Sequence, residues 1–244
     1  MGDDFGDIER FTKFMKLWKD LFIYKLALIQ HLENALPLQT FDFANLKVLD
    51  VENNKLPDNV SLEEGALLEP LAVGVYACKR AKIEVGANVL ILGAGPIGLV
   101  TLLVAKARGA STVIIADLNE SRINLAKQLG ADDVYLVKKE SEENKNVEQI
   151  CRLFDEKPSI TIDACGFESS IRLAIQVTKT GGKAVIVGMG ANEVKLPLIN
   201  ALCREVDILG VFRYANDSFQ LSYVSLNIYP RIMNFLLLQE ITLY

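Results

Sequence analysis

Three glycines and one aspartate have the types and the spacing of a site for a phosphate-containing ligand. Residues 93–98 read G-A-G-P-I-G and follow a continuous apolar run that ends at Leu92. In such a loop the first glycine allows a tight turn, the second lets the backbone approach a pyrophosphate, and the third lets a helix pack closely on a strand. Asp117 lies 19 residues after Gly98, where a carboxylate can accept hydrogen bonds from ribose hydroxyls. The pattern predicts a dinucleotide-binding loop, with Gly93, Gly95, Gly98 and Asp117 as binding residues.

The elements that must position this loop indicate an α/β fold. Helical patterns separate apolar runs that are continuous rather than alternating, which is typical of strands buried on both faces of a parallel sheet. The expected strands are Val89–Leu92, Val113–Ala116, Val134–Val137, Ile160–Ala164, Lys183–Val187 and Val206–Phe212. We therefore predict a Rossmann fold, a doubly wound parallel sheet with strand order 3-2-1-4-5-6. Its ligand would lie across the carboxyl ends of the strands.

Composition excludes several other classes of function. The chain has 244 residues, a hydrophobic fraction of 50% and a net charge of −5, so we expect no nucleic-acid partner. Its four cysteines form no C-x-x-C pair, so neither a zinc ribbon nor a disulfide framework is indicated. The acidic start lacks the basic region of a signal peptide, and no apolar segment is long enough to cross a membrane. A cytoplasmic location is the expectation.

The two ends of the chain differ in character from its middle. We divide the chain into a divergent, helical extension at 1–54, a helical connector at 55–84, a Rossmann domain at 85–216 and a divergent segment at 217–244. Residues 1–36 have helical periodicity and either pack on their own domain or bind a partner. Leu46 to Leu56 fit one leucine-rich repeat, but a stable solenoid needs at least three.

Glu69 stands alone among apolar residues. The run from Gly65 to Cys78 contains no other charged residue, and a buried carboxylate without a partner is costly. Glu69 either lies on an exposed side of a helix or caps it, or it faces a metal ion or a substrate. Its position in the sequence leaves both interpretations open.

Further motifs resemble a known family. They include KLPDNV at 55–60, EEGAL at 63–67, EPL at 69–71, the glycine loop at 93–98, REVDI at 204–208 and GVFRY at 210–214. Together they resemble the polyol dehydrogenases of the sorbitol (L-iditol 2-) dehydrogenase type, within the zinc-containing medium-chain dehydrogenases. The resemblance runs from about residue 55 to about residue 216. It implies that a hydride passes from a secondary alcohol of a polyol to NAD, which gives a ketose.

The resemblance also implies roles for individual residues. Glu69 matches the glutamate beside the zinc and the substrate, which makes it the catalytic and metal-binding candidate, and Arg213 and Tyr214 match substrate-contacting positions. Asp117 favours NAD, because a carboxylate would repel a 2′-phosphate. The matched cofactor-binding positions are Ile97, Asp117, Arg122, Val187, Gly188, Met189, Val211, Phe212 and Arg213.

The zinc ligands of the family are mostly missing. Its N-terminal GroES-like domain supplies a cysteine, a histidine and a further glutamate, whereas no cysteine precedes Cys78 here and His31 lacks the preceding glycine. One carboxylate cannot hold a catalytic zinc, which needs about three protein ligands. We therefore expect most of the catalytic domain to be absent, and zinc not to be held by this chain alone. The alternative function is an NAD(H)-binding fragment without turnover. Apolar residues from Leu68 to Val75 would then lie open and favour association with itself or with full-length subunits.

Overall fold

The apolar runs form six parallel strands in the computed structural model, which describes residues 68–138 and 143–214. The strands are β1 (Asn88–Leu92), β2 (Thr112–Asp117), β3 (Asp133–Leu136), β4 (Ile160–Asp163), β5 (Lys183–Ile186) and β6 (Asp207–Gly210). Their order is β3-β2-β1-β4-β5-β6, which confirms the predicted Rossmann topology. Leu92 at the end of β1 pairs with Ala116 of β2 on one side and with Asp163 of β4 on the other. The carboxyl ends of these three strands therefore lie next to each other.

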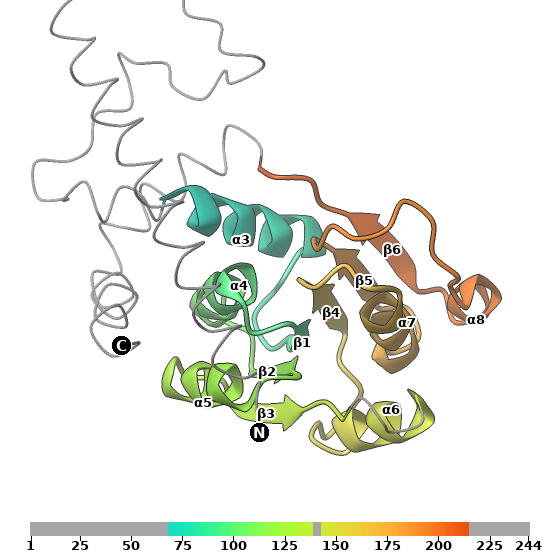
Figure 1. Cartoon of the computed structure of the whole chain (residues 1–244), viewed down its shortest axis with the longest axis horizontal. Helices are drawn as coiled ribbons and strands as arrows, with labels where there is room; N and C mark the ends of the chain where they lie inside the picture. The colour runs from blue at the N-terminus through green and yellow to red at the C-terminus, as the bar shows by residue number, and fades with distance from the viewer. Residues whose placement is uncertain (1–67, 139–142, 215–244) are drawn as a thin grey trace, which may run out of the picture. The chain divides into compact units, whose positions relative to one another are not determined.

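Helices cover both faces of the sheet (Figure 1). They are α3 (Leu68–Ala81), α4 (Pro96–Ala107), α5 (Glu120–Gln128), α6 (Glu143–Cys151), α7 (Glu168–Val177) and α8 (Leu198–Cys203). Helices α4 and α5 lie on one face, and α6 and α7 lie on the other. The sequence analysis did not predict α8. This helix has only six residues, and Leu198, Ile199 and Leu202 are exposed on it, so no buried periodicity marked it.

Alternate residues of the strands supply the core. Leu90 and Leu92 of β1 are buried with Ile114 of β2 in one cluster that includes Ile150 of α6 and Ile175 of α7. Successive side chains of a strand point to opposite faces, so the intervening strand residues face the other layer of helices. Because both faces of the central strands are buried, their sequences read as continuous apolar runs, as expected.

Helix α7 ends at Val177 through side-chain hydrogen bonds to its last carbonyls rather than through a glycine. Thr178 has an extended ψ of 134°, and its buried hydroxyl donates to the Ala174 carbonyl at 2.7 Å. The Arg204 guanidinium then donates to the carbonyl oxygens of Ile175 and Thr178, at 2.6 and 2.5 Å. A distant arginine therefore satisfies the last carbonyls of the helix.

The expectation that apolar residues from Leu68 to Val75 lie open is wrong for the residues whose burial is described. Leu71, Val73 and Val75 of α3 are at most 8% exposed. Large exposed apolar side chains among the described residues are Val85 before β1, Leu136 in β3, Ile208 in β6, those on α8, and those that follow β2, β4, β5 and β6.

The described residues from Pro70 onward belong to one compact unit. The predicted extension at 1–54, its repeat-like segment and the segment at 217–244 lie outside the described residues. Within the described part of the chain, no helix is long and apolar enough to cross a membrane.

Candidate functional site

Two of the three loop glycines are required by the fold itself. Gly93 has a φ of +100°, a conformation that side chains other than hydrogen rarely allow. A Cβ atom on Gly98 would lie 1.8 Å from the Gly93 carbonyl oxygen, so helix α4 packs directly against the turn that precedes it. These two positions confirm the turn and the close packing expected from the pattern.

Gly95 is different, because nothing in the described structure requires a glycine there. Its φ of −76° is open to any residue, and no heavy atom lies within 4 Å of the position that a Cβ would take. The missing side chain therefore leaves space outside the chain's own atoms. A ligand that approaches the backbone closely is the physical reason for a glycine at such a position.

The start of α4 provides a place for negative charge beside Gly95. Gly95 is the N-cap residue of the helix and supplies no side-chain hydrogen bond, and Pro96 occupies the first turn. The first N–H groups of a helix lack partners within the helix and carry a partial positive charge. Ile97 is partly exposed in this turn, and its carbonyl accepts the Thr101 hydroxyl at 2.6 Å. The arrangement fits the phosphates of a nucleotide.

Asp117 ties the end of β2 to the glycine loop. One carboxylate oxygen accepts the Ala94 N–H at 2.7 Å, and the other accepts the Asn119 N–H at 2.8 Å. Each carboxylate oxygen has a second lone pair, so the partly exposed group can still accept hydroxyl donors. Arg122 lies in the first turn of α5, where its backbone N–H donates to the Asn119 side chain that caps the helix.

Cys165 lies within the electrostatic influence of these charged groups. Burial, together with the carboxylates of Asp163 and Asp117, raises the pKa of its thiol to about 12, and the Arg122 guanidinium opposes this shift. A Cβ on Gly93 would lie 2.7 Å from the Cys165 sulfur, so this thiol packs against the glycine loop. The thiol is therefore protonated at neutral pH and serves as packing beneath the loop.

Asp163 organises the loops that follow β4 and β5. It is fully buried, which raises the pKa of its carboxyl group, and hydrogen bonds from Ser170, Gly166 and Cys165 oppose that shift. Its carboxylate accepts the Gly166 N–H at 2.9 Å, and its backbone carbonyl accepts the Gly188 N–H, also at 2.9 Å. The sequence analysis did not single out Asp163 or Gly166. The sequence feature that could have indicated them is an aspartate at the end of a strand with a glycine three residues later.

Glycines also allow these two loops to touch. A Cβ on Gly188 would lie 2.1 Å from the Gly166 backbone nitrogen, and one on Gly190 would lie 1.9 Å from the Gly166 carbonyl oxygen. Gly166 itself has a φ of +80°. The backbone of the loop after β5 is thus held directly against the turn after β4.

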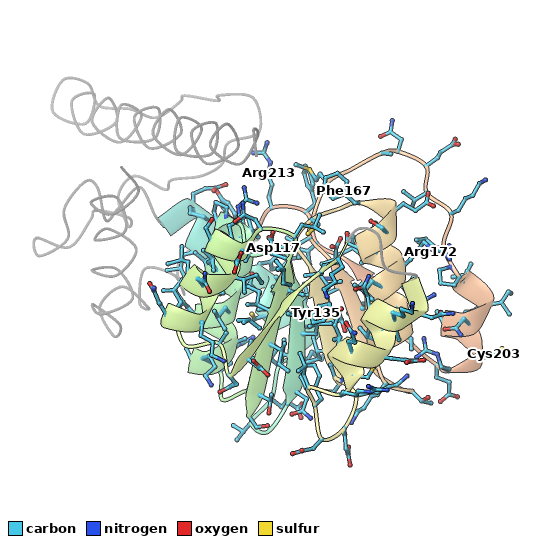
Figure 2. All side chains as sticks on the ribbon, turned by 60° about the horizontal axis from the view of Figure 1, so that its bottom comes forward. Asp117, Tyr135, Phe167, Arg172, Cys203 and Arg213 are labelled. Carbon is cyan, nitrogen blue, oxygen red and sulfur yellow. The ribbon has the colours of Figure 1, made fainter. Side chains whose placement is uncertain are left out.

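Exposed apolar side chains follow the last three strands. Phe167, Met189 and Phe212 are 66%, 80% and 70% exposed, after β4, β5 and β6 respectively. The Arg213 guanidinium lies 5.7 Å from the centre of the Phe212 ring, within range of a cation–π contact. Figure 2 shows Asp117, Phe167 and Arg213 toward the same end of the sheet. Tyr214, the last of the described residues, is partly exposed.

The predicted cofactor residues lie at the carboxyl end of the parallel sheet. They follow the carboxyl ends of β1, β2, β5 and β6, whose parallel register places these ends side by side. Val187 and Val211 anchor their segments through backbone N–H groups that donate at 2.8 Å to Asp163 and Ile186. Their contact with a cofactor stays a prediction.

Glu69 lies in the first turn of α3, where a carboxylate interacts favourably with the helix dipole, and it is partly exposed. Its catalytic, substrate-binding and metal-binding roles remain predictions. Among residues 68–138 and 143–214, no group of three or more histidine, cysteine, aspartate or glutamate side chains could hold a metal ion, so these residues do not fit a zinc site.

Comparison with known proteins gives a consistent assignment. The chain is 53% identical to mouse (Mus musculus) sorbitol dehydrogenase over 162 residues, which cover 66% of this chain and 45% of the mouse protein. It is 49% identical to the sorbitol dehydrogenase of Bombyx mori, over 67% of this chain and 47% of that protein. The crystal structure of 2R,3R-butanediol dehydrogenase from Bacillus subtilis matches 71% of this chain and 48% of its own, with a TM-score of 0.64 and 30% identity.

The chain spans about half the length of these curated relatives. Residues 96–226 match the sequence profile described as zinc-binding dehydrogenase, which is more than half of the chain. The match begins at the start of α4 and includes every strand from β2 to β6. The chain therefore belongs to the zinc-binding dehydrogenase family.

Proposed function

We propose that the described residues bind NAD(H) as the cofactor-binding part of an NAD-dependent polyol dehydrogenase of the sorbitol or L-iditol type. The observation that carries this proposal is Gly95, where no heavy atom lies within 4 Å of a Cβ position beside the uncapped start of α4. The fold explains Gly93 and Gly98 without a ligand. The lack of a side chain at Gly95 is explained if a ligand approaches its backbone closely.

The first half of the sheet would hold the adenosine and the phosphates. The pyrophosphate would lie on the glycine loop at the start of α4, and the Asp117 carboxylate would accept the ribose hydroxyls. The same negative charge would repel the 2′-phosphate of NADP, which supports NAD as the cofactor. Arg122 lies in the first turn of α5, which follows β2.

The second half would hold the nicotinamide mononucleotide, because a Rossmann sheet consists of two mononucleotide-binding halves. Val187, Gly188 and Met189 follow β5, and Val211, Phe212 and Arg213 follow β6. NAD held there would supply a hydride acceptor for the carbon of a secondary alcohol, and the hydroxyl proton would be released as the ketone formed. Arg213 and Tyr214 would bind the polyol at this edge.

A second candidate is a module without turnover, which binds NAD(H) or associates with other subunits. It is favoured by the lack of a metal-binding group in the described ranges and by the exposed side chains of Phe167, Met189 and Phe212. Sorbitol-dependent formation of NADH by the purified, zinc-loaded chain distinguishes the two. Turnover that zinc chelation stops would show that the chain works as a dehydrogenase by itself. NADH binding with no turnover on sorbitol or other polyols would support the second.

A further inference from the structure

The loop at residues 187–197 is fastened to the neighbouring β4–α7 connection at two places. The first is the contact among glycines, where a side chain on Gly188 or Gly190 would collide with the backbone of Gly166. This contact fixes the beginning of the loop directly after β5.

The second fastening grips one residue near the end of the loop. The Glu168 carboxylate accepts the backbone N–H of Lys195 at 3.0 Å, and the Arg172 guanidinium donates to the backbone carbonyl of Lys195 at 3.1 Å. Glu168 and Arg172 are four residues apart on α7, so their side chains lie on the same face of the helix. Both polar backbone groups of a single loop residue are therefore bound by one helix. Figure 2 shows Arg172 on α7.

Between the two fastenings Val194 packs against the core, as does Leu196 beyond Lys195, and the exposed residues 189–193 are the part that such packing does not restrain. Residues 187–197 contain no helix or strand, and residues 189–193 are all exposed. Met189 is 80% exposed, so its side chain adds little packing. An exposed segment with few buried contacts opens easily unless specific hydrogen bonds restrain it.

We propose that Glu168 and Arg172 are positioning residues for the cofactor: by gripping Lys195 they restrain the exposed segment 189–193, and with it Met189, where the nicotinamide half of NAD(H) binds. The inference rests on the proposed function, because it assigns that loop to the nicotinamide. Neither side chain needs to touch the cofactor. Their effect passes through the backbone of the loop, and so it concerns only the nicotinamide half.

The test compares NADH with ADP-ribose, which lacks the nicotinamide. Both ligands are titrated into the full 244-residue chain and into Glu168→Ala, Arg172→Ala and Glu168→Gln. We expect Glu168→Ala and Arg172→Ala to weaken NADH binding about three- to tenfold, and ADP-ribose binding by less than about twofold. Glu168→Gln keeps an oxygen that can accept the Lys195 N–H, so it should restore most of the NADH affinity. Glu120→Ala is the matched control, because Glu120 also opens a helix, α5.

Hydrogen exchange of the ligand-free proteins provides an independent reading. The amides of residues 188–196 should exchange faster in Glu168→Ala than in the unchanged chain, while those of β1 and β2 should not. Equal losses for NADH and ADP-ribose, or no change in loop exchange, would overturn the positioning role. If the unchanged chain binds neither ligand, the proposed function is wrong and the positioning role is rejected with it. If it binds both and the variants leave their ratio unchanged, only the positioning role is rejected.

Discussion

The Asp117 carboxylate accepts a hydrogen bond from the backbone N–H of Ala94 at 2.7 Å, which joins the end of β2 to the glycine loop that follows β1. The residue proposed to select the cofactor therefore also holds the loop proposed to bind its phosphates. Selectivity and loop geometry are coupled at this one side chain, so any substitution of Asp117 should alter both.

Changing Asp117→Ser together with Leu118→Arg should shift preference from NADH toward NADPH. The change removes a charge that repels a 2′-phosphate and places a cation at the exposed position 118. The ratio of dissociation constants, measured by fluorescence titration, should move at least about tenfold toward NADPH. The free energy of unfolding should also fall by about 1–3 kcal/mol, since Ala94 and Asn119 lose their acceptor. A chain that already binds both cofactors equally would contradict the role of Asp117.

Two alanine substitutions in the glycine loop should have different effects. Gly95→Ala should lower thermal stability only slightly, because its φ is ordinary and its surroundings are open but alanine is a poorer N-cap than glycine, yet it should weaken NADH binding at least about tenfold. Gly98→Ala should lower the free energy of unfolding by about 1–3 kcal/mol or more, through the collision with the Gly93 carbonyl. Thermal melts and titrations on both variants check this pair. Normal NADH binding by Gly95→Ala would remove the main support for the proposed site.

Arg204→Ala should destabilise the fold without touching the proposed site. The guanidinium donates to the carbonyls of Ile175 and Thr178 at the end of α7, and its loss leaves these acceptors without their partner. We expect a loss of about 1–3 kcal/mol in urea denaturation. Arg152→Ala is the control, because the exposed ion pair of Arg152 with Glu148, at 3.9 Å, contributes less than about 1 kcal/mol. Equal effects of the two substitutions would show that Arg204 is not a structural cap.

The cysteines should differ sharply in reactivity. Burial raises the pKa of Cys78 and of Cys165 to about 12, so on the order of one thiol in 10⁴ is ionised at pH 8. Alkylation at pH 8, followed by peptide mass spectrometry, should label the exposed Cys203 and spare these two. Because the folded chain holds both protons more tightly than the unfolded chain, their contribution to stability is complete below about pH 9 and is lost toward pH 12. Rapid labelling of Cys165 in the folded chain would show that its surroundings are more open than described.

The strands and their order were predictable because burial on both faces leaves continuous apolar runs such as residues 89–92 and 113–116. The glycine loop was predictable because its spacing is local. Strand ends were less certain by one or two residues: β6 was expected over 206–212 but spans Asp207–Gly210. Beyond Gly210 the residues leave the ladder and become the exposed Phe212 and Arg213.

Contacts between segments far apart in the sequence were not predictable. Arg204 reaches a helix end 26 residues earlier, and Glu168 reaches a backbone 27 residues later. The central position of Asp163 also depends on two loops meeting at Gly166 and Gly188, which no local pattern encodes. The partial exposure of Glu69 in the first turn of α3 agrees with the helix-end interpretation, while its role in binding zinc or substrate stays a prediction.

Titration of NADH into the purified 244-residue chain, with its zinc content measured alongside, tests the central claim most directly. The account predicts saturable binding that ADP-ribose displaces, with or without bound zinc. A chain shown to be folded by circular dichroism that gives no saturable binding up to about 1 mM NADH, an affinity weaker than about −4 kcal/mol, would contradict it.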